Sequence, residues 1–469
     1  MKVVRWKQID WEQVNTYINR LQMRIVKAVQ ENKWRLVKRL QYLITHSFYG
    51  KALAIKRVIS NKGKKTPGID GIVWKSDKDK ETAIQELQLE GYRAKPLRRI
   101  YIEKFGKKEK RPLGIPTMKD RAMQALQLLG LEPIAETIAD TESFGFRKFR
   151  SAQDAMEYSF SILCRKDSPQ WILEGDIKGC FDNISHEWLQ ANIPMDKRIL
   201  KEFMRCGFIY QNKLFPTETG TPQGGIISPT LANITLDGME RLIKEKYWSN
   251  AKGTIDVRNN KKKVHLVRYA DDFVVTGTDI ETLEEIRDLL KEFLAQRGLV
   301  LSEEKTKITS IQEGYDFLGW NFRKYRGKMI IKPSNKSVHK VRMTISNTIR
   351  NNKTSTQANL IYQLNQVMRG WVNYFGMADM KSLLVKTDEW LRHKIRANYW
   401  KHWKKIKTRY RKLKELGMRE EYIQWHACMR QGIWNCSNNR MIQYALNNAK
   451  LRELGYPTFT EFYLKICEN

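Results

Sequence analysis

The sequence predicts an α+β protein in which strands and helices are mixed up to about Pro333 and only helices follow. Two observations indicate the strands: apolar and β-branched residues run or alternate over short stretches near residues 171–176 and 265–275. Helices are indicated where apolar residues recur every three or four positions, as they do over residues 14–29. Beyond Pro333 this helical period dominates and acidic residues become scarce.

The net charge restricts the class of partner. The 469 residues carry a formal charge of +34, with a pI near 9.8. So large a positive charge favours a polyanionic partner, most commonly nucleic acid. An anionic membrane surface or a structural role like that of a ribosomal protein would also fit the charge, but neither explains the acidic motif described next.

The motif HLVRYADDFVV, from His265 to Val275, places two aspartates between apolar strands. Asp271 and Asp272 are expected at or near the tight turn of a hairpin. Adjacent carboxylates in an apolar hairpin are unfavourable unless a positive charge lies against them, and Mg²⁺ is commonly held by one or two carboxylates together with substrate phosphates. The alternative is an ordinary turn that contains two aspartates.

A third candidate carboxylate ends another predicted strand. Asp176 follows the apolar stretch Trp171–Leu173 in WILEGDIKGCFDNISH. An aspartate at a strand end is usually a turn former, so its role depends on whether it meets Asp271 and Asp272 in space.

Two further stretches have the composition of phosphate- or ligand-contacting loops. RRIYIEKFGKKEKRPLGIPT predicts a hairpin that places Lys104 and Arg111 on either side of its turn, where both could contact a triphosphate. TGTPQGGIISPTLAN is glycine-rich around Gln223, permits close approach of a ligand, and leads into a helix near Ser228. Each stretch also has an alternative without a ligand: the first could be an ordinary surface hairpin, and the second an ordinary connecting loop.

Several basic residues are candidates for contact with a nucleic-acid backbone. Their settings are a glycine-rich loop, the SFGFRKFRSAQDA stretch and a helical segment in which cations alternate with aromatic residues. The alternatives are a solvated loop, helix capping and a solvated helix face. The candidates are Lys62, Lys64, Lys65, Arg147, Arg150, Lys404, Lys405 and Arg409.

Other classes are disfavoured. No apolar run approaches the roughly 20 residues of a membrane span, and the N-terminus has no apolar signal core. The six cysteines are scattered, as expected for a reducing compartment. His426, Cys428 and Cys436 lack the paired spacing of a zinc site, so structural cysteines are favoured, and no HNH-like nuclease pattern is present.

With these motifs in order, the chain resembles reverse transcriptases of the bacterial group II intron type. The resemblance runs through NKGKKTPGIDG, RPLGIPT, SFGFRKFRSAQDA, DIKGCFDNISH, TPQGGIISPTLAN, YADD and FLGW. It continues into a maturase-like segment, TSTQANLIYQLNQVMRGWVNYF. It implies a right-hand polymerase with α+β fingers and palm, a helical thumb and a basic helical C-terminal segment, in the bacterial cytoplasm.

The resemblance assigns roles to individual residues. Asp176, Asp271 and Asp272 match the catalytic metal-binding carboxylates, for which two Mg²⁺ ions are implied and Mn²⁺ is a second candidate. One ion would activate the primer 3′-hydroxyl and the other would stabilise the leaving pyrophosphate. Phe181 matches the aromatic gate against a ribose 2′-hydroxyl. The remaining implied positions are Lys104, Arg111, Gln223, Ile177 and Lys305 for dNTP binding, Ile177 for metal binding as well, and Arg98 for nucleic-acid binding.

The expected domain organisation has four parts. Residues 1–75 form an N-terminal helical extension with a basic loop, and residues 76–332 form the fingers and palm. Residues 333–415 form the thumb or maturase domain, and residues 416–469 form a basic helical segment, a candidate for binding DNA or RNA, without an HNH nuclease. The missing nuclease puts cleavage of a second DNA strand by this chain in doubt.

Three functions remain open from sequence. The favoured one is synthesis of DNA on an RNA template with dNTPs and a DNA primer, together with binding of the protein's own intron RNA for splicing and retrohoming. The second is a domesticated reverse transcriptase, templated by a dedicated noncoding RNA and used in antiphage defence or DNA repair. The third is a splicing cofactor that only binds RNA. The oligomeric state is not predicted.

Overall fold

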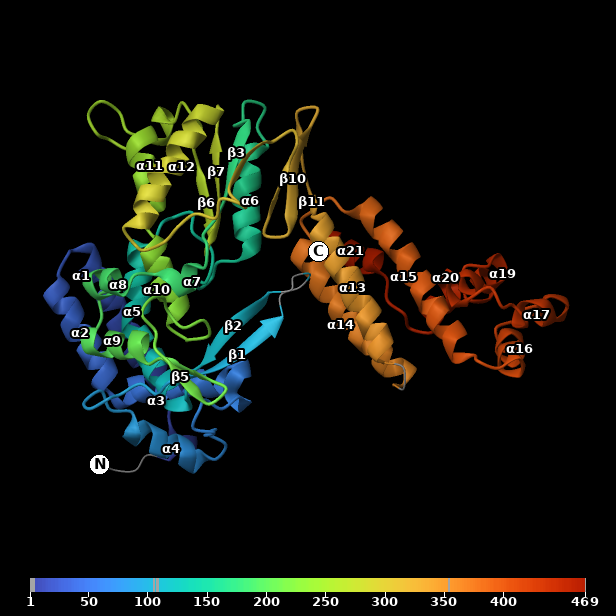
Figure 1. Cartoon of the computed structure of the whole chain (residues 1–469), viewed down its shortest axis with the longest axis horizontal. Coiled ribbons are helices and arrows are strands. Elements are labelled where there is room, and N and C mark those ends of the chain that lie inside the picture. The colour runs from blue at the N-terminus through green and yellow to red at the C-terminus, as the bar shows by residue number, and fades with distance from the viewer. Residues whose placement is uncertain (1–4, 104–105, 107–108, 353–354, 469) are drawn as a thin grey trace. The chain divides into compact units, whose positions relative to one another are not determined.

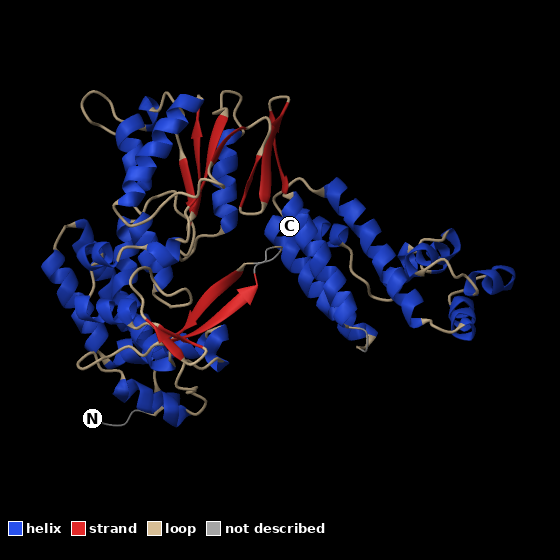
Figure 2. Ribbon diagram, in the orientation of Figure 1, coloured by secondary structure: helices blue, strands red, loops and turns tan. Residues whose placement is uncertain are grey.

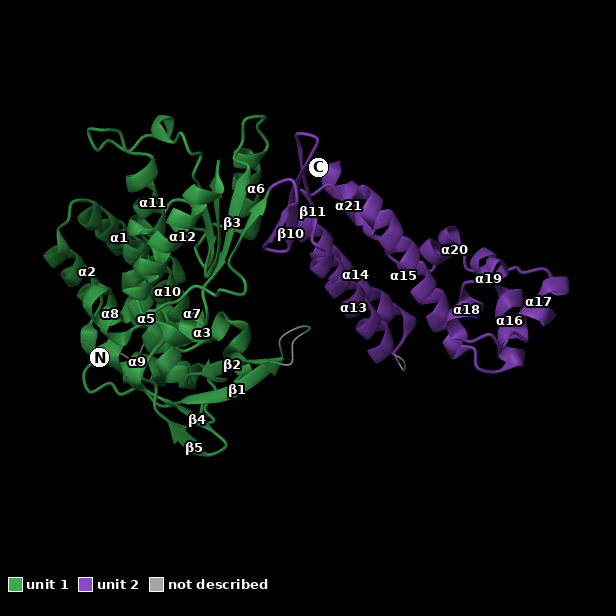
Figure 3. Ribbon diagram, turned by 45° about the horizontal axis from the view of Figure 1, so that its top comes forward, with its two compact units in different colours: residues 1–310 green, residues 311–469 purple. Residues whose placement is uncertain are grey.

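The computed structural model describes residues 5–103, 106, 109–352 and 355–468. The chain forms two compact units, Met1–Ser310 and Ile311–Asn469, called unit 1 and unit 2 below (Figure 3). The β9–β11 sheet of residues 315–333 therefore belongs to the unit that also holds the C-terminal helices. The four functional domains expected from sequence stay a prediction.

The N-terminal part of unit 1 is a helical layer around one buried helix (Figure 1). Helix α5, Met118–Ile138, packs against three of the earlier helices, and most of its side chains are buried. The predicted apolar stripe of α1, from Val14 to Val29, is buried. The elements are η1 Trp6–Gln8, α1 Trp11–Gln30, α2 Trp34–His46, α3 Phe48–Ser60, η2 Lys62–Lys65 and α4 Asp77–Glu86.

The first sheet of unit 1 carries the predicted hairpin. Strand β1, Leu97–Glu103, pairs antiparallel with β2, Lys110–Ile115, and parallel with β4, Phe208–Tyr210. Strand β4 in turn pairs with β5, Lys213–Phe215. The order is β2-β1-β4-β5. Figure 2 draws the strands in red among the blue helices.

The second sheet of unit 1 holds the acidic motifs. Its order is β6-β7-β3-β8, with antiparallel pairing throughout. The strands are β3 Trp171–Asp176, β6 Leu266–Tyr269, β7 Asp272–Gly277 and β8 Lys307–Ser310. Helix α12, Ile280–Ala295, packs against β3 and β7, while α6, Ala152–Leu163, packs against β6.

Shorter helices connect these sheets within unit 1. They are α7 Cys180–Asn183, α8 His186–Asn192, α9 Lys197–Arg205, α10 Ser228–Leu236, α11 Met239–Tyr247 and η3 Val257–Asn259. The predicted start of a helix near Ser228 is confirmed, and Pro229 lies in its first turn, where its missing N–H costs no hydrogen bond.

Unit 2 begins with a small antiparallel sheet and continues with helices, as the sequence predicts beyond Pro333. The sheet order is β11-β10-β9. Its core includes Trp320, which stacks on Tyr374 with ring centroids 4.5 Å apart. The elements are β9 Tyr315–Phe317, β10 Trp320–Tyr325, β11 Lys328–Pro333, α13 Asn335–Asn351, α14 Gln357–Phe375, α15 Lys381–His402, α16 Ile406–Glu415, α17 Glu420–Ala427, α18 Ile433–Ser437, α19 Arg440–Ala445, α20 Asn448–Glu453 and α21 Phe459–Cys467.

The α+β class is confirmed, and so are the predicted strands at the acidic motifs. In the part of the chain that the structure describes, no helix is both long and apolar enough to span a bilayer. The cysteines are free thiols, in agreement with their scattered spacing.

Candidate active site

The three predicted catalytic aspartates meet at one end of the β6-β7-β3-β8 sheet. Asp176 and Asp272 are directly opposed in the β3–β7 register. Asp271 occupies the turn before β7, which is tight enough to place Ala270 at φ 57°. Directly opposed like charges destabilise a sheet. The strands therefore hold carboxylates together that would otherwise repel each other.

A glycine makes this close pairing possible. Gly175 lies opposite Phe273 in the same register, and the Phe273 ring covers the position that a Cβ on Gly175 would occupy. Phe273 is buried beneath the acidic end of the sheet. The sequence EGD before Ile177 is thus explained by packing as well as by chemistry.

Burial and mutual repulsion raise the pKa values of two of the three aspartates. Asp271 is half-buried and Asp272 is exposed on its outer side, but both stand over the packed sheet. Loss of hydration on the protein side raises the pKa of Asp271. The same burial, followed by repulsion from Asp271 and Asp176, raises the pKa of Asp272 to about 7.

Lys305 partly compensates the acidic cluster. Its Nζ lies 2.6 Å from Oδ2 of Asp176, and half of its side chain remains exposed, at 52%. The hydrogen bond with Asp176 raises the pKa of Lys305. Lys305 was predicted to bind the dNTP, and the structure places its ammonium group at the carboxylates.

The backbone after Asp176 is fixed by the segment around Leu301. The Ser302 N–H donates to the Asp176 carbonyl, and the Lys178 N–H donates to the Val300 carbonyl. Peptide groups alternate in direction along a strand, so the Ile177 carbonyl points away from this segment, toward the side of β7. The Ile177 side chain is buried, which leaves its main chain as the group that could contact a metal ion or dNTP.

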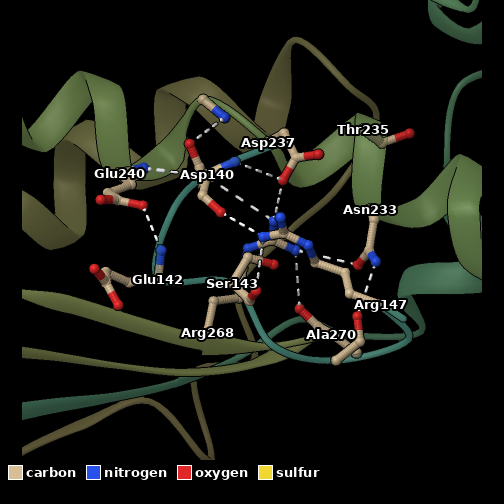
Figure 4. Close-up of polar contacts among 12 residues, drawn as sticks. Asp140, Glu142, Ser143, Arg147, Asn233, Thr235, Asp237, Glu240, Arg268 and Ala270 are labelled. Carbon is tan, nitrogen blue, oxygen red and sulfur yellow. Dashed lines mark hydrogen bonds and ion pairs between the residues drawn. The ribbon is translucent and has the colours of Figure 1, made fainter. Parts of the chain in front are cut away.

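Behind the acidic turn lies a buried ionic network centred on Arg268 of β6 (Figure 4). The Arg268 side chain is fully buried. Its guanidinium forms an ion pair with Asp237 and lies 4.0 Å from a carboxylate oxygen of Asp140. The same group donates to the Ala270 carbonyl at 3.5 Å, so it contacts the turn that carries Asp271.

The loop of residues 140–147 runs alongside β6 and completes this support. Phe144 N–H donates to the Arg268 carbonyl at 2.8 Å. Gly145 passes so close to the turn that an added Cβ would lie 2.9 Å from the Tyr269 carbonyl carbon and closer still to the Ala270 nitrogen. The Gly145 carbonyl accepts from the Asn233 amide at 2.8 Å. The catalytic turn is thus packed against a loop that is itself fixed.

Phe181 and Gln223 lie on adjoining segments. Phe181, on α7, is half-buried, and its carbonyl accepts from the Thr221 N–H at 2.6 Å. The side-chain amide of Gln223 donates to Oδ2 of Asp182 at 2.9 Å. The main-chain carbonyl of Gln223 accepts from the Gly114 N–H at 2.7 Å. The glycine-rich loop therefore connects α7 to strand β2.

The predicted triphosphate-binding residues are on the β1–β2 hairpin. Arg111 is exposed on β2, and its positive charge lowers the pKa of Asp271, in opposition to the larger effect of burial. Lys104 lies outside the described residues. Arg98 on β1 is half-buried, and its Nε has no hydrogen-bond partner among the residues that the structure describes.

The remaining basic candidates divide into engaged and exposed side chains. Arg147 donates to the carbonyls of Asp140 and Ser143 and pairs with Glu136. Arg150 donates to the Thr141 carbonyl.

In unit 2, Arg409 donates to the Trp403 carbonyl and lies over the Trp400 ring. These three arginines therefore hold the protein's own backbone. The exposed candidates, whose charges face solvent, are Lys62, Lys64, Lys65, Lys404 and Lys405.

The acidic end of the sheet fits a divalent cation by its charge. As they stand, no three His, Cys, Asp or Glu side chains in the described ranges are gathered closely enough to hold an ion. Lys305 occupies one oxygen of Asp176. Burial, and after it repulsion between the carboxylates, raises the pKa of Asp271 and of Asp272, so a cation placed beside them would favour their ionised forms. His426, Cys428 and Cys436 form no such group either.

Sequence comparisons identify the class of protein. A family profile described as reverse transcriptase (RNA-dependent DNA polymerase) matches residues 102–322. The N-terminal domain of reverse transcriptase matches residues 6–87, and the group II intron maturase-specific domain matches residues 338–417. The chain is a reverse transcriptase with a maturase domain.

Similarity to individual proteins shows which family of reverse transcriptases the chain belongs to. The group II intron-encoded protein LtrA of Lactococcus lactis subsp. cremoris is 31% identical over 446 residues, covering 76% of this chain and 73% of that protein. Protein YkfC of Escherichia coli K12 is 34% identical over 328 residues, covering 62% and 84%. The 91 kDa protein in the cob intron of Schizosaccharomyces pombe is 32% identical over 322 residues, covering 57% and 39%. The chain belongs to the family of group II intron-encoded reverse transcriptases.

Sequence reasoning did not single out the supporting residues Arg268, Asp140, Asp237 and Gly145. One signal was present: an arginine within the apolar strand LVRY must be paired if it is buried. The identity of its carboxylate partners had no such signal, because Asp140 and Asp237 lie far from it in the chain.

Proposed function

We propose that Asp176, Asp271 and Asp272 are the catalytic residues with which this reverse transcriptase extends a DNA primer on an RNA template. The observation that carries the proposal is the direct opposition of Asp176 and Asp272 in the β3–β7 register, with Asp271 in the adjoining turn. The three carboxylates, with the Ile177 carbonyl, would hold two divalent ions, Mg²⁺ in the first place and Mn²⁺ as a second candidate. Bound there, the ions would supply charge stabilisation for the attacking and leaving oxygens.

The neighbouring residues would bind and select the dNTP. Arg111, together with Lys104, would pair with the triphosphate, since Arg offers a bidentate fork and Lys a point charge. Gln223 would contact the nucleotide from the glycine-rich loop, whose backbone is held against β2. Lys305 would keep the carboxylates paired until a metal ion and dNTP arrive. Phe181 would exclude a ribose 2′-hydroxyl by steric contact.

Primer extension on an RNA template tests the catalytic assignment. Asp271→Ala and Asp272→Ala should abolish extension with Mg²⁺, whereas Asp288→Ala should retain it. Asp288 is an exposed aspartate on α12 that pairs with Lys291, so it controls for the removal of a surface carboxylate. Extension by either active-site variant at the wild-type rate would overturn the assignment. A thermal shift on Mg²⁺ addition, present in wild type and lost in both variants, would report binding without turnover.

RNA binding for splicing is the second proposed activity. It is supported by the maturase-specific match over residues 338–417 and by the exposed Lys404 and Lys405 at the start of α16. Charge reversal at both lysines should weaken RNA binding and reduce its salt dependence. Arg409→Ala should instead lower stability, because its guanidinium holds backbone carbonyls.

The identity of the RNA separates an intron role from a domesticated one. Sequencing of RNA that co-purifies with the protein should recover intron RNA containing splice sites. Recovery of a dedicated noncoding RNA without splice sites would favour the defence or repair function, and binding without polymerisation would favour the cofactor role. The DNA primer, the dNTPs and the cytoplasmic location stay predictions.

A further inference from the structure

Two phenylalanines in the loop before α6 have a backbone conformation that is rare for bulky side chains. Phe146 has φ 60° and Phe149 has φ 59°, both in the left-handed region. The Phe149 side chain is fully exposed, at 102%. Phe146 is 54% exposed, and its ring meets Phe181 edge-on, with centroids 6.1 Å apart at 79°. The two residues thus share a strained backbone but differ in what their rings contact.

Phe146 is held in this conformation from both sides. On one side, Gly145 is packed against the Tyr269–Ala270 backbone, and its carbonyl accepts from Asn233. On the other side, the Arg147 guanidinium is bound to the Asp140 and Ser143 carbonyls and to Glu136. A strained residue persists only where its surroundings over-determine it, and such residues cluster at functional sites. The fixed flanks leave the Phe146 ring directed at Phe181.

Phe181 has its main chain and its ring held by different elements. Its carbonyl accepts from Thr221, and the glycine at position 220 passes within van der Waals contact of the same peptide. Those contacts fix the backbone of α7, and the ring itself is half-buried and packs in part against the hydrophobic core of unit 1. Phe146 meets the ring itself.

We propose that Phe146 is a positioning residue for sugar selection, which holds the Phe181 ring where a ribose 2′-hydroxyl would collide with it. The inference rests on the proposed role of Phe181 as the sugar gate. The same loop touches the catalytic turn through Gly145 and the gate through Phe146. It therefore sets the position of the gate relative to Asp271 and Asp272.

The selectivity ratio is the quantity that this role would change. With Phe146 removed, the Phe181 ring keeps its packing against the core but loses the edge-on contact with its other partner, so it can shift aside more easily for a ribonucleotide. Utilisation of the dNTP needs no such movement and should change less. An edge-to-face aromatic pair contributes enough to alter a ratio by about three- to tenfold.

The test measures kcat/KM for a dNTP and for the matching rNTP in primer extension on RNA. Phe146→Gly removes the ring and also removes the backbone strain, because glycine adopts positive φ without cost. Phe149→Gly is the matched control, since it relieves the same strain at a ring that is fully exposed. Phe146→Tyr keeps a ring at the gate, and Phe181→Ala removes the gate itself.

The inference predicts a distinct result for each variant. Phe181→Ala should lose most discrimination against the rNTP, Phe146→Gly should lose about three- to tenfold, and Phe146→Tyr and Phe149→Gly should stay at the wild-type ratio. Combining Phe146→Gly with Phe181→Ala should add no further loss, because Phe146 acts through Phe181.

Other outcomes would contradict the inference, and they would show whether the role of Phe146 or the role of Phe181 is wrong. If Phe181→Ala loses discrimination but Phe146→Gly keeps it, Phe146 does not position the gate, while the proposed gate stands. If the double variant loses more than Phe181→Ala alone, Phe146 acts independently of the gate and the inference fails. If Phe181→Ala keeps the wild-type ratio, both the gate and the inference are wrong. Equal losses in Phe146→Gly and Phe149→Gly would indicate a general effect of the loop and would also overturn it.

Discussion

Two cation–aspartate contacts flank the acidic turn, and they differ in burial. Behind the turn, Arg268 is fully buried and is bound by Asp237 and Asp140. In front, Lys305 is bound to Asp176 at 2.6 Å but is 52% exposed. A buried charge without its partner is strongly destabilising, whereas an exposed pair contributes little. The rear contact therefore determines where the turn lies, and the front contact leaves the carboxylates free to change partner.

This difference explains how a folded protein tolerates an acidic site. The repulsion among Asp176, Asp271 and Asp272 acts on a turn whose backbone is held by Arg268 and by the 140–147 loop. The three carboxylates can therefore stay close together, despite their repulsion, without local unfolding of the turn. Four predictions test the contrast between front and rear, from the largest expected effect to the smallest.

At the front, Asp272→Asn should reduce primer extension about a thousandfold, equivalent to about 4 kcal/mol of transition-state stabilisation. Without divalent ions it should not lower the free energy of unfolding, because it removes a carboxylate whose raised pKa reports an unfavourable charge. Steady-state kinetics and urea denaturation measure the two effects. A marked loss of stability would show that the front carboxylates also hold the fold.

At the rear, Arg268→Leu should lower the free energy of unfolding by about 3–5 kcal/mol, since Asp237 and Asp140 would be left buried without their cation. Adding Asp237→Asn should recover part of this loss. Urea denaturation of the single and double variants measures both. A loss below about 1 kcal/mol would contradict the contrast between the two contacts.

Gly145→Ala tests the packing of the loop against the turn. The new Cβ would meet the Tyr269–Ala270 backbone, so stability should fall by about 1–3 kcal/mol and extension should fall with it. Gly370→Ala on α14 is the control, because its Cβ would meet no atom within 4 Å and alanine favours a helix. The midpoint of thermal unfolding should fall in Gly145→Ala and rise in Gly370→Ala. Equal shifts would argue against a close approach at Gly145.

Lys305→Met should have the smallest effect on stability, within about 1 kcal/mol, because half of the Lys305 side chain is exposed to solvent, although the Asp176 side chain is only 18% exposed. The proposed contact with the metal- and dNTP-binding groups should instead appear as a higher KM for the dNTP. Lys291→Met, which breaks an exposed pair on α12, should match its stability change and leave KM unaltered. Identical KM values in the two variants would show that Lys305 does not take part in dNTP binding.

Much of the fold could be predicted locally, because period and capping act over short stretches of chain. The buried stripe of α1, the hairpin around Asp271 and the helix starting at Ser228 depend on neighbours a few residues away. The roles of Arg147 and Arg150 could not be predicted this way. Both were candidates for nucleic-acid contact, and both donate to carbonyls of residues 140–143 that only the folded loop brings near.

By itself the sequence determined the class of fold, the order of the motifs and the residues that carry the proposed chemistry. Charge, hydrophobic period and short motifs are properties of the chain alone. The tertiary structure decided which of those residues meet: Asp176 with Asp272, Arg268 with Asp237, and Phe146 with Phe181. Each pair joins distant segments, so its geometry depends on strand register and on the packing of a loop against a turn, which no local pattern specifies.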